Sequence, residues 1–279
     1  MLEIACIQTN SGGDAEANLR EIERMAGGAV EGGAQFLALP EVADFQGAGP
    51  DAYRAYAPFE TDHRALGRLR ALAAQLKTWM LVGSVSVRET PERLANRSYL
   101  LGADGAIVDR YDKIHLFDVT LPDGESHRES DLFVAGRRAV VADTPWGAAG
   151  LSICYDLRFP SLYRRLAQAG AKLIFIPAAF TETTGALHWH TLIRARAIET
   201  GAYVVAPAQC GKFAGDRGCY GHSLIVDPWG RVLADGGETA GVVRASLDLA
   251  EVDRFRAAIP SPMVERPFDL ETVRETASV

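Results

Sequence analysis

The chain has 279 residues, a formal net charge of −7, 48% hydrophobic residues and 23% charged residues. These proportions exclude fibrous and wholly disordered chains, and the acidic balance argues against nonspecific nucleic-acid binding. Four cysteines are too few for a disulfide scaffold. No run approaches the ~20 apolar residues that span a bilayer, so we expect no membrane association. No signal-peptide pattern stands at the N-terminus, and the sequence therefore predicts a cytoplasmic protein with free thiols.

Strand-like and helical patterns alternate along the first part of the chain. Short continuous apolar runs predict buried strands, and apolar residues at helical spacing predict helices. The first predicted elements are a strand at 2–8, a helix at 15–31, a strand at 35–40, a helix at 62–76 and a strand at 79–87.

The middle of the chain changes to hairpins before the alternation resumes. Turn signals at Ala103-Asp104-Gly105 and Thr144-Pro145-Trp146-Gly147 separate paired strands. The later predicted elements are strands at 97–102, 106–112, 138–143 and 148–153, a helix at 160–169, a strand at 172–177, a helix at 187–200, a strand at 202–208, a hairpin at 221–235, a strand at 241–247 and a helix at 249–257.

No break in composition divides the chain, so we expect one domain over residues 1–279, with a tail from about residue 260. The longest irregular stretch, about 114–137, predicts a functional or poorly ordered loop. Roughly a dozen strands approach the upper limit for one open twisted sheet. Hairpins mixed with strand–helix units therefore predict an α/β fold of two mixed sheets, packed face to face with helices outside.

Three reactive side chains lie at or near the ends of predicted strands. Glu41 follows an apolar strand, Lys113 follows a hairpin strand, and Cys154 ends an apolar strand shortly before a helix. The start of a helix lowers the pKa of a nearby thiol, and the thiolate is the reactive form. Taken singly, each residue has an ordinary explanation: a solvated carboxylate, an exposed lysine and a buried structural cysteine.

The three residues are more specific together than apart. Glu41 in LPE, Lys113 in YDKIHLFD and Cys154 in ICYDLRFP occur in this order, and PAAFTETTGALHWHTLIRARAIE and CYGHSLIVDPWG follow at 177–199 and 219–230. These motifs resemble the nitrilase superfamily of carbon–nitrogen hydrolases over nearly the whole chain. The resemblance implies a four-layer α-β-β-α sandwich that usually forms a homodimer or a higher homo-oligomer.

The resemblance also implies roles for individual residues. Glu41 is expected to act as general base, Lys113 to stabilise the oxyanion and Cys154 to attack the carbonyl carbon. The family has a second glutamate after the lysine, which Glu129 matches in its motif.

Two further expectations concern the support of this triad. Glu125 lies in the same loop as Glu129 and is the alternative second glutamate. The backbone N–H of Tyr155 is expected to hold the oxyanion together with the lysine.

Longer stretches of the chain look like the small amidases that include ω-amidase and deaminated glutathione amidase. This likeness implies hydrolysis of the amide bond of a small carboxylate through a cysteine thioester, with release of ammonia. AQCG at 208–211 and YGHS at 220–223 look closer to the deaminated glutathione amidases. Deaminated glutathione is therefore ranked first among the possible substrates. A monoamide of the 2-oxoglutaramate type is ranked second, and nitriles or N-carbamoyl compounds are ranked lower.

A substrate with a carboxylate requires a cationic partner. The candidates for this contact are Arg158, Arg194, Arg196, Lys212 and Arg217. Arg158 has a structural alternative, in which it pairs with Asp156 and braces the turn after Cys154. Phe180 and Thr181 follow the strand at 172–177, and by position they are expected to line the pocket beside Cys154.

Other readings of the sequence remain open. His188 and His190 are two residues apart, so they face different directions on a helix. Cys210, Cys219 and His222 lack the spacing of a zinc finger. No metal is therefore expected. No nucleotide-binding motif occurs, so no cofactor is expected. A Cys–His hydrolase, which needs a histidine beside Cys154, and a non-catalytic scaffold of the same fold are the alternatives.

Overall fold

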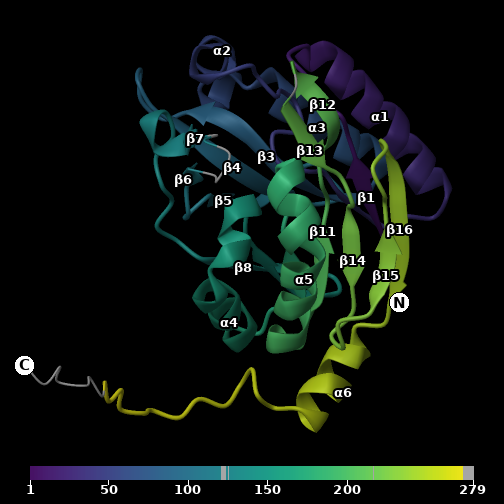
Figure 1. Ribbon diagram of the computed structural model, residues 1–279. Helices are drawn as coiled ribbons and strands as arrows, with labels where there is room; N and C mark the ends of the chain where they lie inside the picture. Colours follow the sequence, from purple (N-terminus) through teal and green to yellow (C-terminus); the bar gives the residue numbers. More distant parts are fainter. Residues whose placement is uncertain (121–123, 125, 216, 273–279) are drawn as a thin grey trace, which may run out of the picture.

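Two six-stranded mixed sheets form the centre of the molecule (Figure 1). The computed structural model describes residues 1–120, 124, 126–215 and 217–272. In the first sheet β1, β2 and β3 are parallel and the other pairs antiparallel. The strand order of this sheet is β16 (Gly241–Leu247), β1 (Leu2–Gln8), β2 (Phe36–Ala38), β3 (Trp79–Arg88), β4 (Leu94–Leu101) and β5 (Ile107–Asp112).

The second sheet repeats this arrangement with the later part of the chain. Strands β9, β10 and β11 are parallel, and hairpins extend the sheet on both sides. The strand order of this sheet is β15 (Val232–Asp235), β14 (Leu224–Val226), β11 (Tyr203–Ala206), β10 (Leu173–Phe175), β9 (Gly147–Leu151) and β8 (Val140–Thr144).

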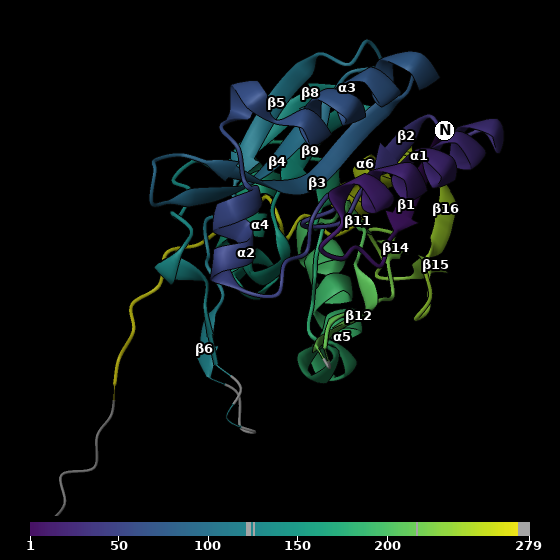
Figure 2. The same cartoon turned by 90° about the horizontal axis from the view of Figure 1, so that it is seen from above.

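Helices cover the outer faces of both sheets (Figure 2). Helices α1 (Ala15–Glu31) and α3 (Arg64–Leu76) pack on the first sheet, and α4 (Pro160–Gln168) and α5 (Glu182–Thr200) pack on the second. Two further helices, α2 (Pro50–Tyr56) and α6 (Ala250–Ala258), lie outside this stack. The order helix, sheet, sheet, helix confirms the four-layer sandwich.

Strand β1 shows why the sheets pack in this way. Successive side chains of a strand point to opposite faces, so a strand between two layers must be apolar throughout. Ala5 and Ile7 pack among the residues of α1 and α3, whereas Ile4 and Cys6 pack among residues of the second sheet. The continuous apolar run of β1 is therefore the signature of burial on both faces.

The first and last strands of the chain are neighbours in one sheet. Strand β1 pairs antiparallel with β16 along its whole length, from Leu2 opposite Leu247 to Gln8 opposite Gly241. The two ends of the folded chain are thereby hydrogen-bonded to each other.

The structure differs from the predicted elements in three places. Helix α5 begins at Glu182 rather than at residue 187, and α2 has no predicted counterpart. Two small hairpins are also new, namely β6 (Asp118–Thr120) with β7 (Ser126–Arg128), and β12 (Cys210–Ala214) with β13 (Arg217–Tyr220). Strands of three to five residues are too short to show a clear alternation of apolar and polar residues. The sequence therefore predicts loops where the structure has these two hairpins.

Two observations concern the surface and the end of the chain. Among the described residues no helix is both long enough and apolar enough to cross a membrane. Residues 259–272, which follow α6, contain no helix or strand in the described part.

Candidate active site

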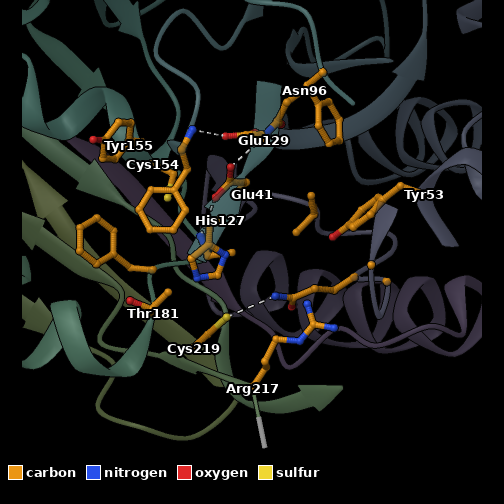
Figure 3. Close-up of a pocket in the computed structure, with 18 of the residues that line it drawn as sticks. Glu41, Tyr53, Asn96, His127, Glu129, Cys154, Tyr155, Thr181, Arg217 and Cys219 are labelled. Atoms are coloured by element: carbon orange, nitrogen blue, oxygen red, sulfur yellow. Dashed lines mark hydrogen bonds between the residues drawn. The ribbon is translucent and has the colours of Figure 1, made fainter. Parts of the chain in front are cut away.

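A pocket of about 760 Å³ lies where loops from both sheets meet (Figure 3). Its wall includes Glu41 after β2, Lys113 after β5, Cys154 after β9 and Ala179 after β10. All four residues follow the carboxyl ends of strands, which is where α/β sheets gather their functional side chains. The structure thus brings together the three residues that the motifs of the sequence singled out.

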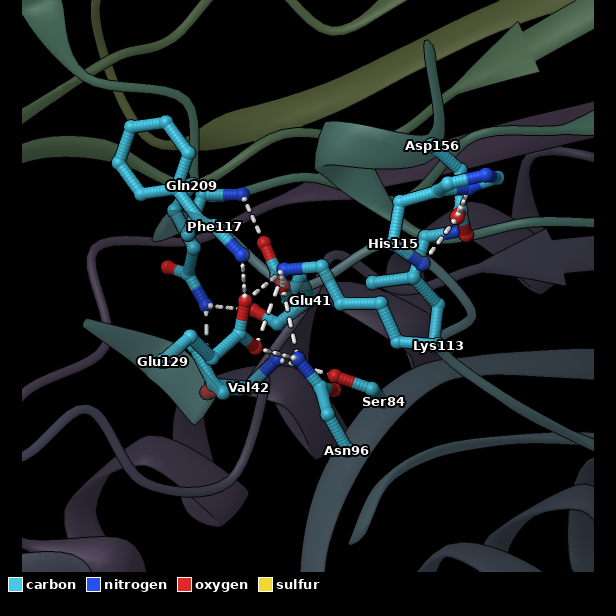
Figure 4. A network of polar contacts seen from close by, with 12 residues as sticks. Glu41, Val42, Ser84, Asn96, Lys113, His115, Phe117, Glu129, Asp156 and Gln209 are labelled. Carbon is cyan, nitrogen blue, oxygen red and sulfur yellow. Dashed lines mark hydrogen bonds and ion pairs between the residues drawn. The ribbon is translucent and has the colours of Figure 1, made fainter. Parts of the chain in front are cut away.

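Lys113 is the centre of a buried polar network (Figure 4). Its Nζ lies 2.8 Å from Glu41 Oε1 and 2.9 Å from Glu129 Oε2. Glu129 Oε2 also accepts a hydrogen bond of 2.7 Å from the backbone N–H of Phe117. Glu129 therefore binds the ammonium group together with Glu41, while Glu125 lies outside the described residues.

Asn96 belongs to the same network, although nothing in the sequence singled it out. Its Nδ2 donates to Glu41 Oε1 at 2.9 Å and to Glu129 Oε1 at 3.2 Å. Asn96 is buried on β4, and its own carbonyl accepts the backbone N–H of Lys113 at 3.0 Å. One amide thus fixes the spacing of two carboxylates and of the lysine between them.

Cys154 occupies a strained turn. Its φ angle is +47°, in the left-handed region that non-glycine residues seldom adopt, and its N–H donates to Pro177 O at 2.9 Å. A single-turn 3-10 helix, Cys154–Arg158, separates β9 from α4. The turn presents the thiol to the pocket, whose wall Glu41 also lines.

The electrostatics of the site assign a protonation state to each group. Burial alone would raise the pKa of Glu41, but Lys113, the Cys154 thiol and the Ala179 N–H together lower it below its ordinary value. Burial and the charge of Glu41 raise the pKa of Cys154 well above its ordinary value. Burial would lower the pKa of Lys113, but Glu129 and Glu41 raise it. At neutral pH the site therefore holds a carboxylate, a thiol and an ammonium group.

Asp156 connects the cysteine turn to the lysine loop. Its carboxylate accepts from Tyr111 Oη at 2.7 Å, from His115 N at 3.0 Å and from Ile153 N at 2.9 Å. The suggested pair between Asp156 and Arg158 is wrong, because Arg158 instead lies 3.3 Å from His188 Nδ1. A fully buried carboxylate takes the hydrogen-bond donors that the surrounding backbone leaves unpaired.

Replacement of Asp156 by alanine is expected to destabilise the fold. It leaves the Tyr111 hydroxyl and two backbone N–H groups buried without an acceptor, which costs about 3 kcal/mol or more. Denaturant unfolding measures this loss, and Asp156→Asn, which keeps one acceptor oxygen, should lose less. An unfolding free energy within about 1 kcal/mol of the parent for the alanine variant would contradict this role.

Gln209 ties the two sheets together behind Glu41. Its Nε2 donates to Glu41 O at 3.0 Å, and its Oε1 accepts from Thr9 Oγ1 at 2.9 Å and from Ser11 N at 3.0 Å. Val42, next to Glu41, has a φ angle of +48°. This fully buried amide therefore holds the unusual backbone that aims the Glu41 carboxylate.

The predicted substrate contacts divide into two groups. Tyr155, Phe180 and Thr181 line the pocket. Arg158 and Arg194 are not among its described lining residues, and the Arg194 Nε donates to Gly230 O at 2.8 Å. The guanidinium carbon of Arg158 lies 5.2 Å from the centre of the Phe180 ring.

The remaining cysteines are all free and buried. Cys6 lies in the core between the sheets, and burial raises its pKa. Burial raises the pKa of Cys210 to about 11 and that of Cys219 to about 12. These thiols stay protonated at neutral pH, including Cys219, which lines the pocket.

The histidines have other neighbours than the reactive thiol. His127 lines the pocket, and its ring centre lies 4.8 Å from that of Phe117. His190 Nε2 and His222 Nδ1 both contact Asp235, at 3.0 and 2.9 Å, so hydrogen bonds account for these nitrogen atoms. The charge of Glu41 raises the pKa of Cys154, which favours a carboxylate over an imidazole as the partner of the thiol.

Known proteins share both the sequence and the architecture. The chain is 38% identical to a deaminated glutathione amidase from Synechocystis over 92% of its length and 95% of that protein. The C. elegans NitFhit protein matches with a TM-score of 0.88 and 38% identity over 93% of this chain, which spans 63% of that protein. A Glu-to-Gln variant of an amidase from Nesterenkonia matches with a TM-score of 0.79 and 28% identity, over 92% of this chain and 94% of that one.

A family model described as carbon-nitrogen hydrolase matches residues 3–257. The Nesterenkonia amidase is described as belonging to the nitrilase superfamily. The chain therefore belongs to the carbon-nitrogen hydrolase family, within the nitrilase superfamily, and is an enzyme that hydrolyses carbon–nitrogen bonds.

Proposed function

We propose that this protein is an amidase with a Cys–Glu–Lys catalytic triad and that deaminated glutathione is its best substrate. The observation that carries the proposal is the buried ion pair between the Glu41 carboxylate and the Lys113 ammonium group, on the pocket wall that Cys154 also lines. The amidase names of relatives that are 36% and 38% identical over most of the chain support the substrate class. The chain acts as one carbon-nitrogen hydrolase domain.

The first half of the reaction forms a thioester. Cys154 Sγ attacks the amide carbonyl carbon while its proton passes to Glu41. The carbonyl electron pair moves to oxygen, where the Lys113 ammonium and the Tyr155 backbone N–H stabilise the negative charge. Glu41 then gives its proton to the nitrogen as the C–N bond breaks, so the amine leaves neutral.

The second half of the reaction regenerates the thiol. Glu41 takes a proton from water, and the oxygen of that water adds to the thioester carbonyl carbon. The C–S bond breaks, the acid product leaves, and Cys154 recovers its proton. Because Glu129 holds the Lys113 ammonium at 2.9 Å, the oxyanion stabiliser stays fixed through both halves.

The lowered pKa of Glu41 bears on how the proton moves. The pKa of Glu41 is lowered and that of the Cys154 thiol is raised. A base this weak cannot remove the proton of the thiol in a step of its own, before the sulfur attacks. Proton transfer must therefore accompany formation of the C–S bond, when the sulfur loses its basicity. The resting thiol is protected from reaction until a carbonyl carbon is in place.

The chemistry of the substrate determines what is released. Deaminated glutathione carries two carboxylates, and both of its amide nitrogens are substituted, so its hydrolysis releases an amine and not ammonia. A monoamide of the 2-oxoglutaramate type releases ammonia. A pocket of about 760 Å³ has room for deaminated glutathione, the larger of the two molecules. This volume supports ranking deaminated glutathione first among the substrates.

A substrate panel tests the proposal. The purified protein is assayed with deaminated glutathione, 2-oxoglutaramate, a simple aliphatic amide and a nitrile, with liquid chromatography and mass spectrometry of the acid products. We expect the highest kcat/KM with deaminated glutathione. A preference for 2-oxoglutaramate would assign the chain to ω-amidase, and turnover of the nitrile alone would overturn the amidase proposal.

Asn96→Ala tests the positioning of Glu41. Removal of the Nδ2 donor takes a stabilising hydrogen bond from the Glu41 carboxylate, so the pKa of Glu41 should rise. Activity requires the ionised carboxylate, and the acidic limb of the pH–kcat/KM profile should therefore move to higher pH. We also expect kcat to fall about 10- to 100-fold. A lower kcat without movement of the acidic limb would contradict this role.

The assembly and location of the protein are part of the same proposal. We infer a homodimer or a higher homo-oligomer in the cytoplasm, with a small-molecule amide as the partner and no cofactor. The usual assembly of the family supports the oligomer, and the dependence on a reduced thiol at Cys154 supports a reducing compartment. A single species with the mass of one chain in light scattering at high concentration would overturn the oligomer.

A further inference from the structure

The structure separates the cationic residues that are candidates for binding the substrate carboxylate. Four of them contact other groups of the protein and are not among the described lining residues of the pocket. Arg196 Nε donates to Leu157 O, Arg194 Nε donates to Gly230 O, Lys212 Nζ lies 2.6 Å from Glu182 Oε2, and Arg158 lies 3.3 Å from His188 Nδ1. Arg217 is the candidate among these five that lines the pocket.

Arg217 lies on β13 at one end of the pocket. Figure 3 shows Arg217 and Cys219 at one end of the view and Asn96 with Glu129 at the other, with Cys154 and Glu41 between them. The Arg217 side chain is exposed, packs over Phe213 at 5.6 Å and donates to the backbone carbonyl of Ala48. These contacts use one face and one nitrogen of the guanidinium group, which has five N–H donors in all.

Three of the carboxylates that line the pocket are paired with lysines. Glu41 and Glu129 both bind the Lys113 ammonium, and Glu182 is paired with Lys212. Cys219, two residues after Arg217, stays a neutral thiol, and its Sγ accepts from Gln46 Nε2 at 3.3 Å. A guanidinium group that binds no carboxylate among the described residues suits a substrate carboxylate.

The path of the chain shows which side of the substrate meets Arg217. Glu41 protonates the leaving nitrogen in the proposed mechanism, so the amine part of the substrate lies on the Glu41 side. The segment that follows Glu41 runs through Gln46 and Gly47 along the pocket wall to Ala48, to which Arg217 is bound. The oxyanion side is formed by Lys113 and Tyr155 instead. Arg217 therefore stands along the path of the leaving amine.

We propose that Arg217 binds a carboxylate on the amine side of the scissile bond. The preferred substrates are then amides whose leaving amine is an amino acid or a short peptide with a free C-terminal carboxylate. This inference rests on the proposed amidase function and narrows it. It excludes primary amides as the best substrates, since their leaving group is ammonia and has no carboxylate.

The test compares one substrate in two forms. Deaminated glutathione is prepared with its free glycine carboxylate and with that carboxylate converted to a primary amide. With the parent enzyme, kcat/KM should be about 10- to 100-fold higher for the acid, which is the range of a charge-assisted hydrogen bond. With Arg217→Gln this preference should disappear through a higher KM for the acid, and the amide form should keep its parent KM.

Two further variants separate a specific contact from a general effect of charge. Arg217→Lys keeps the charge and should recover part of the preference for the acid. Arg54→Gln removes an arginine from α2 whose Nη1 is paired with Asp51 at 2.8 Å, and it should keep the full preference. Equal loss of both substrate forms with Arg217→Gln, or the same loss with Arg54→Gln, would overturn the inference.

A binding measurement keeps this inference separate from the proposed function. The Cys154→Ala protein, with and without Arg217→Gln, is titrated calorimetrically with both forms of the substrate. If the parent enzyme hydrolyses neither form, the proposed function fails. An Arg217-dependent preference for the acid in binding would still support the carboxylate subsite, whereas equal binding of both forms would overturn it.

Discussion

Cys154→Ala is expected to lose turnover by on the order of 10⁴- to 10⁶-fold. Alanine removes the atom that forms the thioester, while Glu41, Lys113 and Asn96 keep their contacts with one another. Without the nucleophile, these groups can only polarise the amide and position a water molecule. Substrate affinity should therefore stay near that of the parent, and the loss should lie in kcat.

Steady-state assays and intact-protein mass spectrometry after acid quench measure this effect. The parent should show a mass increase equal to the acyl part of the substrate, located on Cys154, and the alanine variant should show none. Cys210→Ala serves as the matched control, because Cys210 is buried but does not line the pocket. Release of product by the Cys154→Ala variant at the parent rate would refute the nucleophile assignment and favour a non-catalytic thiol.

Glu41→Gln is expected to reduce turnover by on the order of 10⁴-fold and to make the Cys154 thiol more acidic. The charge of Glu41 raises the pKa of Cys154, whereas the charge of Lys113 lowers it. Removal of the first charge leaves the second, so the pKa of the thiol must fall. The same substitution thus abolishes hydrolysis and increases the thiolate fraction at neutral pH.

Alkylation by iodoacetamide measures the second effect. The midpoint of the pH–rate profile for Cys154 should lie lower in Glu41→Gln than in the parent. A Glu-to-Gln variant of the Nesterenkonia amidase carries an acetamide moiety on its active-site cysteine, which shows that the cysteine of that relative still reacts. Retention of parent turnover, or a midpoint at higher pH, would contradict the assignment of Glu41 as the base.

The positions of the reactive residues could be read from the sequence because each one follows a strand. The runs before Glu41, Lys113 and Cys154 predicted strands, and the structure places all three residues on one pocket. Their roles came from a resemblance and not from the pattern. The start of α5 was misplaced because Glu182-Thr183-Thr184-Gly185 has no apolar periodicity, although the helix begins there.

The supporting polar residues could not be predicted, for a physical reason. Asn96, Asp156 and Gln209 act through atoms that lie far away in the sequence, such as Glu41 for Asn96 and Tyr111 for Asp156. A buried polar residue has the same sequence signal whether it supports a reactive group or only satisfies the backbone. Only the tertiary arrangement distinguishes the two cases.

The pairing of β1 with β16 has a consequence for how the protein is made. Residues 2–8 leave the ribosome long before their antiparallel neighbour, which ends at residue 247. One edge of this strand must therefore stay unpaired until the chain has been synthesised as far as residue 247. Such distant pairing makes folding slow and leaves a growing chain prone to aggregation. A prematurely terminated chain would lack β16 and expose the unpaired, aggregation-prone edge of β1. Such a chain would be a target for chaperones and proteases.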